Sequence, residues 1–146
     1  LGMAIENAAL NSHQGKHRTI AADAFTSLEK MIEDEKTFDI VVIDPPSFAK
    51  KESEIDRAKQ SYYRLASLGV HLVARNGILL LASCSSRMKA DTFFGLCEDA
   101  MKAEGFNTSA GSGRRFELIE KTFHDIDHPV TFPEGAYLKA GYYRKL

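Results

Sequence analysis

Two stretches of the chain, residues 38–43 and 78–82, are apolar almost throughout. Neither shows the alternation of polar and apolar positions that marks a strand with one face in water. Short runs of this kind are typical of strands that are buried on both faces of a parallel sheet. The pattern therefore predicts two central strands of such a sheet.

A long helix is predicted between these strands. The apolar residues between positions 55 and 73 fall on one helix face. Ser53 and Asp56 have the spacing of a capping box at its start, and Asn76-Gly77 is a typical helix end. We therefore expect one helix from residue 53 to about residue 75.

Weaker patterns complete the expected fold. Short helices are predicted for residues 1–10, after Asp23 and before Gly105, and short strands for residues 19–22, 116–123 and 136–144. The alternation of strands and helices is typical of an α/β fold with a largely parallel sheet. The last two strands have no helix between them, which favours an antiparallel hairpin at one edge.

A polar motif directly follows each of the two central strands. Asp44-Pro45-Pro46-Ser47-Phe48 follows the first, and Ser83-Cys84-Ser85-Ser86 follows the second. In open α/β sheets, ligands bind beyond the carboxyl ends of the strands. If the two strands are neighbours, about 4.8 Å apart, then Asp44 and Cys84 face one crevice. This pairing is the active-site hypothesis.

The two prolines make the first motif rigid. Each proline fixes its own φ angle, and the residue before a proline is kept out of the helical region. Asp44 and Phe48, held in this way, can hydrogen-bond the edge of a planar base and stack on its face. The alternative is that Asp44 only caps a turn at the end of the strand.

Cys84 is surrounded by serines and precedes a predicted helix, whose first-turn amides can stabilise a thiolate. This environment suits a nucleophile. A cysteine at the end of a core strand can equally be a small buried hydrophobic residue, so both interpretations stay open. Cys97 lies on the apolar face of a helix and is expected in the core.

Composition narrows the class of protein. The chain has 146 residues, 44% hydrophobic and 27% charged, which is enough for one globular domain. Its net charge of -1 is not that of a freestanding nucleic-acid-binding protein. Two cysteines are too few for a disulfide framework, which fits a cytoplasmic protein. The histidines show no metal-site spacing on a helix, so a bound metal ion is not expected. Gly111-Ser112-Gly113 lacks the third glycine of the dinucleotide fingerprint, so a dinucleotide is not expected either.

Motifs along nearly the whole chain resemble the C-terminal part of class I S-adenosylmethionine-dependent methyltransferases. Within these enzymes the chain is similar to the RlmI type, which methylates carbon 5 of a cytosine in bacterial large-subunit ribosomal RNA. The matching segments are residues 6–11, Asp23-Ala24-Phe25, residues 44–48, Tyr62, Ser83-Cys84-Ser85, Asp127-His128-Pro129 and Pro133-Glu134-Gly135.

The resemblance implies a Rossmann-like class I methyltransferase sheet, S-adenosylmethionine as cofactor and ribosomal RNA as partner. The residues it assigns to cofactor binding are Asp23, Ala24, Phe25 and Asp44. The residues it assigns to contact with the base are Pro45, Pro46, Phe48 and Tyr62. Cys84 would be the catalytic nucleophile, and Asp44 would assist at the ring nitrogen.

The chain also departs from the family. The family's first strand, its glycine-rich turn and its RNA-binding domain have no counterpart here, and Ser47 stands where related cytosine methyltransferases have a second cysteine. We therefore expect residues 1–146 to form a single truncated catalytic domain that neither binds the cofactor tightly nor is active alone. The strand at residues 38–43 would have a bare edge, which predicts pairing with residues 19–22 or a homodimer.

Two other functions stay open. Asp44, the prolines and Phe48 would also suit an N-methyltransferase that acts on an exocyclic amine of a nucleic acid, with Cys84 only structural. A binding or scaffold module that has lost catalysis is the third alternative.

Overall fold

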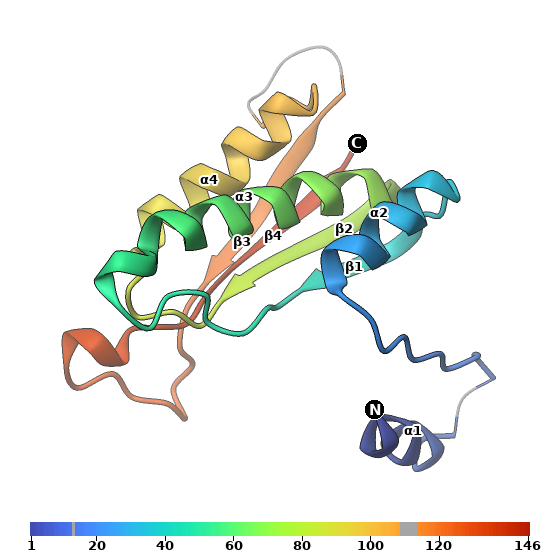
Figure 1. Ribbon diagram of the computed structural model, residues 1–146, viewed down its shortest axis with the longest axis horizontal. Helices are drawn as coiled ribbons and strands as arrows, with labels where there is room; N and C mark the ends of the chain where they lie inside the picture. Colours follow the sequence, from blue (N-terminus) through green and yellow to red (C-terminus); the bar gives the residue numbers. More distant parts are fainter. Residues whose placement is uncertain (13, 109–113) are drawn as a thin grey trace.

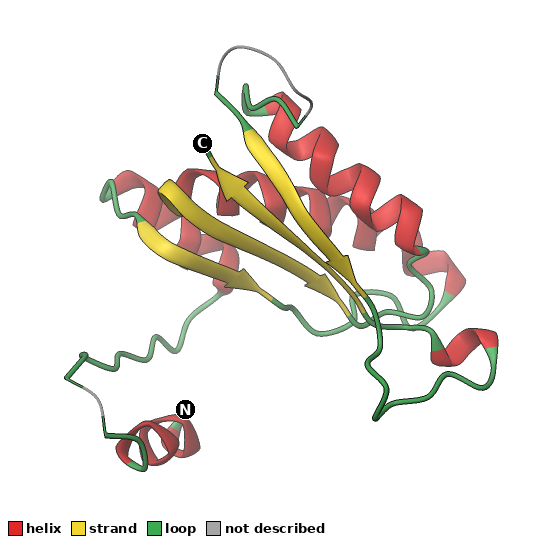
Figure 2. Cartoon of the chain, turned by 180° about the vertical axis from the view of Figure 1, so that it is seen from behind, coloured by secondary structure: helices red, strands yellow, loops and turns green. Residues whose placement is uncertain are grey.

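The computed structural model describes residues 1–12, 14–108 and 114–146, so the glycine motif at residues 111–113 lies outside the described residues. The α/β fold is confirmed. A four-stranded mixed sheet is covered on one face by helices, as Figure 1 shows from the helix side and Figure 2 from the sheet side.

The sheet has the strand order β1-β2-β4-β3. Its strands are β1 (Phe38–Ile43), β2 (Val73–Ser83), β3 (Phe116–Thr122) and β4 (Lys139–Lys145). β1 and β2 are parallel neighbours, whereas β4 runs antiparallel to both β2 and β3. The expected parallel pair and the antiparallel closing hairpin are therefore confirmed.

The helices are α1 (Gly2–Ala9), α2 (Ala24–Glu33), α3 (Ile55–Leu72) and α4 (Ala90–Ala103), with short 3₁₀ turns η1 (Glu52–Glu54) and η2 (Pro133–Gly135). α3 packs against β1 and β2 and contacts both α2 and α4 (Figure 1). The largest buried side chains between helices and sheet include Leu72, Leu79, Phe93, Met101, Phe116 and Tyr143. No helix within the described ranges is long and apolar enough to cross a membrane.

The start of α3 differs from the predicted one. The carboxylate of Glu54 accepts hydrogen bonds from the backbone N–H groups of Lys50 (2.8 Å) and Lys51 (3.1 Å). Glu54 therefore fixes the entry into the helix, and the expected capping box of Ser53 with Asp56 is wrong. The helix begins only at Ile55, because the Glu54 carboxylate already provides hydrogen-bond acceptors for the backbone N–H groups in the turn before it.

The end of α3 also differs. The helix stops at Leu72, and the chain enters β2 at once, because Val73 pairs with Phe38 of β1. Asn76, at φ 65°, and Gly77 form an irregularity inside β2 instead of ending the helix. A Cβ atom at position 77 would lie 2.8 Å from the backbone oxygen of Asp39, so this close approach requires glycine.

β1 is an edge strand, and only one of its faces is covered. Ile40 is 67% exposed and Val42 59% exposed, so the prediction that this strand is buried on both faces is wrong for this chain. Residues 19–22 form no strand, so their expected pairing with β1 is also wrong. Their chain leads from the start of α2 away from the sheet (Figure 1). The homodimer across this edge stays a prediction.

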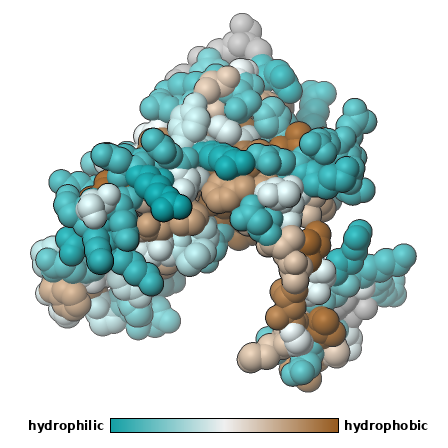
Figure 3. Space-filling model, viewed as in Figure 1, coloured by the Kyte–Doolittle hydropathy of each residue, from teal (hydrophilic) through white to brown (hydrophobic). Residues whose placement is uncertain are grey.

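α1 lies apart from the sheet (Figures 1 and 2) and buries none of its residues. Leu1, Met3, Ile5 and Leu10 are all more than half exposed. Figure 3 shows hydrophobic side chains gathered on this N-terminal segment. The helix was predicted correctly, but it contributes nothing to the core that positions the site.

Candidate functional site

The carboxyl ends of β1 and β2 bring the two polar motifs together. Ile43 pairs with Leu81 in the parallel register, so Asp44 and Cys84 follow neighbouring strand ends. The Sγ atom of Cys84 lies 3.9 Å from the backbone oxygen of Pro45. The expectation that Asp44 and Cys84 follow adjacent parallel strands is confirmed, whereas their chemical roles stay predictions.

A hydrogen bond from Ser85 joins the turn after β2 to the segment after β1. The hydroxyls of Ser47 and Ser85 both donate to the backbone oxygen of Ala49, over 3.2 and 3.3 Å. Ala49 is buried, so the chain after β1 is folded onto the turn after β2. Cys84 is partly exposed in this arrangement, whereas Cys97 is buried in the core as expected, and burial raises the pKa of the Cys97 thiol.

Tyr62 lies beneath the first motif, inside the core. Its ring contacts that of Phe48 edge to face, with centroids 5.0 Å apart, and its hydroxyl accepts a hydrogen bond from Ser83 over 2.9 Å. The residue is only 3% exposed, and burial raises the pKa of its hydroxyl. Tyr62 therefore links the aromatic ring of one motif to the residue before Cys84.

A pocket of about 570 Å³ opens at the carboxyl end of β1. Its walls come from the start of α2, the end of β1, the first motif and α3, and include Asp23, Ala24, Phe25, Leu28, Asp44, Pro45, Pro46, Phe48 and Leu65. Every residue predicted to bind the cofactor lines this pocket. Of the residues predicted to contact the base, Pro45, Pro46 and Phe48 line the pocket and Tyr62 does not. The predicted nucleophile, Cys84, does not line the pocket either.

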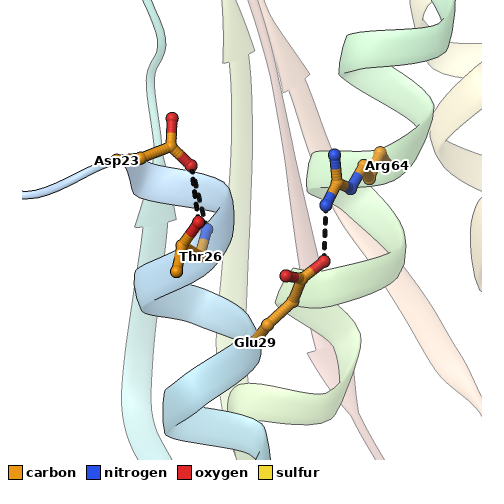
Figure 4. Close-up of polar contacts among 4 residues, drawn as sticks. All are labelled: Asp23, Thr26, Glu29 and Arg64. Carbon is orange, nitrogen blue, oxygen red and sulfur yellow. Dashed lines mark hydrogen bonds and ion pairs between the residues drawn. The ribbon is translucent and has the colours of Figure 1, made fainter.

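Asp23 shapes the pocket by starting α2. One carboxylate oxygen, Oδ1, accepts hydrogen bonds from the backbone N–H of Thr26 (3.0 Å) and from its hydroxyl (3.2 Å), as Figure 4 shows. The backbone hydrogen bond from Thr26 lowers the pKa of Asp23 below its usual value. Arg64 of α3 forms an ion pair with Glu29 of α2, which ties the helices together beside the pocket (Figure 4).

One charged residue at the site, Lys139, was not predicted from the sequence. Its side chain is buried, and its ammonium group donates hydrogen bonds to backbone oxygens of the turn after β2 and of the closing hairpin. The only signal in the sequence is a single lysine at the start of the otherwise apolar residues 138–143. The described residues contain no group of three or more His, Cys, Asp or Glu side chains suited to a metal ion.

The fold is that of the class I S-adenosylmethionine (SAM)-dependent methyltransferases. A crystal structure of a methyltransferase complexed with SAH superposes with a TM-score of 0.72 at 21% identity. A structure described as a SAM-dependent methyltransferase from Streptococcus mutans gives 0.74 at 19% identity. Each match covers 99% of this chain and 35% of the other.

Comparison with curated relatives points to a narrower group of methyltransferases than the fold does. The ribosomal RNA large subunit methyltransferase I of Shewanella frigidimarina is 35% identical over 142 residues, which is 95% of this chain and 34% of the relative. The ribosomal RNA large subunit methyltransferase of Deinococcus radiodurans is 36% identical over 141 residues, 96% of this chain and 33% of the relative. The chain thus spans about a third of the length of these relatives and matches their C-terminal part, which confirms the resemblance. A comparison with models of known protein families gives no match.

Proposed function

We propose that this chain is the catalytic part of a SAM-dependent methyltransferase that methylates carbon 5 of a cytosine in large-subunit ribosomal RNA. The observation that carries the proposal is the convergence of Asp44 and Cys84 at neighbouring strand ends, beside a pocket that Asp44 also lines. The names of the curated relatives support the RNA substrate.

The chemistry of the pocket fits the cofactor. SAM carries a planar adenine and a positively charged sulfonium centre. Phe25 offers apolar surface to a planar ring, and the carboxylates of Asp23 and Asp44 offer acceptors and negative charge. A volume of about 570 Å³ is in the usual range for small-molecule sites. The bound cofactor would supply the methyl group.

Cys84 would make the cytosine ring reactive. Carbon 5 of cytosine is a poor nucleophile, but addition of the Cys84 thiolate to carbon 6 gives an enamine that is nucleophilic at carbon 5. Once carbon 5 carries the methyl group, loss of its proton and departure of the cysteine sulfur restore the ring. Cys84 is partly exposed, so a cytosine ring can reach its sulfur atom.

Asp44 would hold the base during this addition. Its carboxyl group can hydrogen-bond the base edge and assist protonation at the ring nitrogen as the sulfur adds. Pro45 and Pro46 keep the motif extended, and Phe48, supported from below by Tyr62, offers a face on which the base can stack.

The test is to identify the methylated nucleoside. The full-length protein is incubated with large-subunit ribosomal RNA and SAM, and the digested RNA is analysed by mass spectrometry. We expect 5-methylcytidine, lost in Cys84→Ser and kept in the matched Cys97→Ala variant. A product methylated on the exocyclic amine, or an active Cys84→Ser enzyme, would favour the N-methyltransferase alternative. The same assay on residues 1–146 tests the expectation that this part is inactive alone.

A further inference from the structure

Lys139 is a buried charge directly beside the strand that delivers Cys84. In the antiparallel pairing of β2 with β4, Lys139 lies opposite Ser83, the residue before Cys84. It is 2% exposed. Lysine is almost never buried to this extent unless its ammonium group has partners.

The partners of Lys139 are backbone oxygens. The Nζ atom donates to Ser85 (2.6 Å), Met88 (2.6 Å) and Tyr137 (2.9 Å). These three bonds use all the donors of an ammonium group. The turn that follows Cys84 is therefore wrapped around a positive charge, which also joins it to the closing hairpin.

We propose that Lys139 is a positioning residue for Cys84, which holds the turn after β2 in place and favours the thiolate form of the cysteine. This inference rests on the proposed role of Cys84 as nucleophile. It adds a residue from β4 to a site otherwise built from the ends of β1 and β2, the start of α2 and α3. It also explains why a lysine is buried where an apolar residue would pack.

The surrounding charges agree with this role. Burial lowers the pKa of Lys139 to about 8, and the nearby Cys84 opposes this shift by favouring the charged ammonium. The Tyr62 hydroxyl, on α3, interacts electrostatically with Cys84 and with Asp44 at the end of β1, and, besides burial, both raise the pKa of this hydroxyl. Burial raises the pKa of Tyr62, so this hydroxyl is neutral at pH 7. With a pKa of about 8, Lys139 carries a positive charge at pH 7, beside the turn that follows Cys84.

Lys145 provides a matched control. It lies at the other end of β4, and its Nζ atom likewise donates to backbone oxygens, those of Val70 (3.1 Å) and Val73 (2.7 Å). Burial lowers the pKa of Lys145 as well. Replacing either lysine removes a partly or fully buried ammonium from backbone oxygens, but only Lys139 is next to the cysteine turn.

The experiment measures how fast Cys84 reacts with iodoacetamide between pH 6 and pH 10, without RNA or cofactor. Peptide mass spectrometry separates Cys84 from the buried Cys97. The readout is the rate at pH 7 divided by the rate at pH 10, because this ratio cancels differences in access to the sulfur. We expect Lys139→Met to lower the ratio about tenfold, and Lys145→Met to leave it unchanged.

An unchanged ratio in folded Lys139→Met, or an equal fall in Lys145→Met, would overturn the proposal. If circular dichroism shows that Lys139→Met is unfolded, the wild-type ratio is compared with that of a synthetic peptide of residues 80–88. A wild-type ratio no higher than that of the peptide would also overturn it. Because no RNA is present, this result is independent of whether the protein methylates cytosine.

Discussion

The sulfur atom of Cys84 lies 3.9 Å from the backbone oxygen of Pro45, across the ends of two parallel strands. Pro45 also lines the pocket that contains Asp23 and Asp44. A single residue thus joins the predicted nucleophile to the predicted cofactor pocket. The arrangement would allow a base to meet the cysteine on one side and the methyl donor on the other.

The hydrogen bond from Ser83 to Tyr62 should stabilise the region that presents Cys84. Tyr62→Phe leaves the buried Ser83 hydroxyl without its acceptor, so we expect the free energy of unfolding to fall by about 1–2 kcal/mol. Ser83→Ala should cost at least as much, because it also removes the acceptor of the Ser85 N–H. The two changes together should cost less than their sum. Urea unfolding of the two single variants and the double variant measures this coupling. Additive effects would contradict the contact.

The two strands with strong apolar patterns and their polar endings could be predicted from sequence. The predicted strand at residues 38–43 has the same bounds as β1. The placement of Asp44 and Cys84 at neighbouring ends follows from the parallel crossover between β1 and β2. The exposure of Ile40 and Val42 could not be deduced from the local pattern, because it depends on whether another element covers the second face of β1.

Asp23 should stabilise the fold in a pH-dependent manner. Its pKa is lowered in the native state, chiefly by the Thr26 backbone hydrogen bond, so its contribution is present above its ordinary pKa of 3.8. This contribution is lost as the pH falls through the lowered native value. We expect Asp23→Ala to be less stable than wild type at pH 7 and the difference to shrink below about pH 4.

Urea unfolding at a series of pH values measures this difference. Asp23→Asn is the matched control, because asparagine keeps the N-cap acceptor without the titrating charge. A stability gap between wild type and Asp23→Ala that is the same at pH 3 and pH 7 would show that the charged carboxylate does not contribute.

Gly69 allows α3 to lie close to the sheet. A Cβ atom there would be 2.7 Å from Cδ1 of Ile43 and 3.1 Å from Cδ1 of Leu79. We expect Gly69→Val to lower the free energy of unfolding by about 1–3 kcal/mol because it overpacks this contact. Gly95→Val is the control, since a Cβ atom at Gly95 of α4 meets nothing within 4 Å. Equal losses in the two variants would point to helix propensity instead of packing.

Tyr143 should tolerate loss of its hydroxyl. The side chain is fully buried, and within the described residues its hydroxyl has no hydrogen-bond partner. Tyr143→Phe removes the cost of burying this group, so thermal unfolding should occur at the same or a higher temperature than in wild type. A clear fall in the melting temperature would mean that the hydroxyl is satisfied in solution.

The features that sequence reasoning missed depend on contacts between distant segments. Lys139 resembles an ordinary lysine of an edge strand, and only the folding of the turn at Ser85 and Met88 around it makes it a buried charge. The early end of α3 likewise follows from pairing of Val73 with Phe38, which outweighs the helical pattern up to residue 75.

A covalent bond between Cys84 and cytosine distinguishes the proposed carbon-5 methylation from methylation of the exocyclic amine. This bond is tested by incubating the full-length protein with SAM and RNA that carries 5-fluorocytidine. Fluorine replaces the proton on carbon 5 that must be lost before the cysteine can leave, so the covalent adduct is trapped. We predict a protein–RNA species stable to denaturing electrophoresis, with the RNA attached to the Cys84 peptide, and none in Cys84→Ser. Methylation of unmodified RNA with no trapped species would show that Cys84 does not bond to the base.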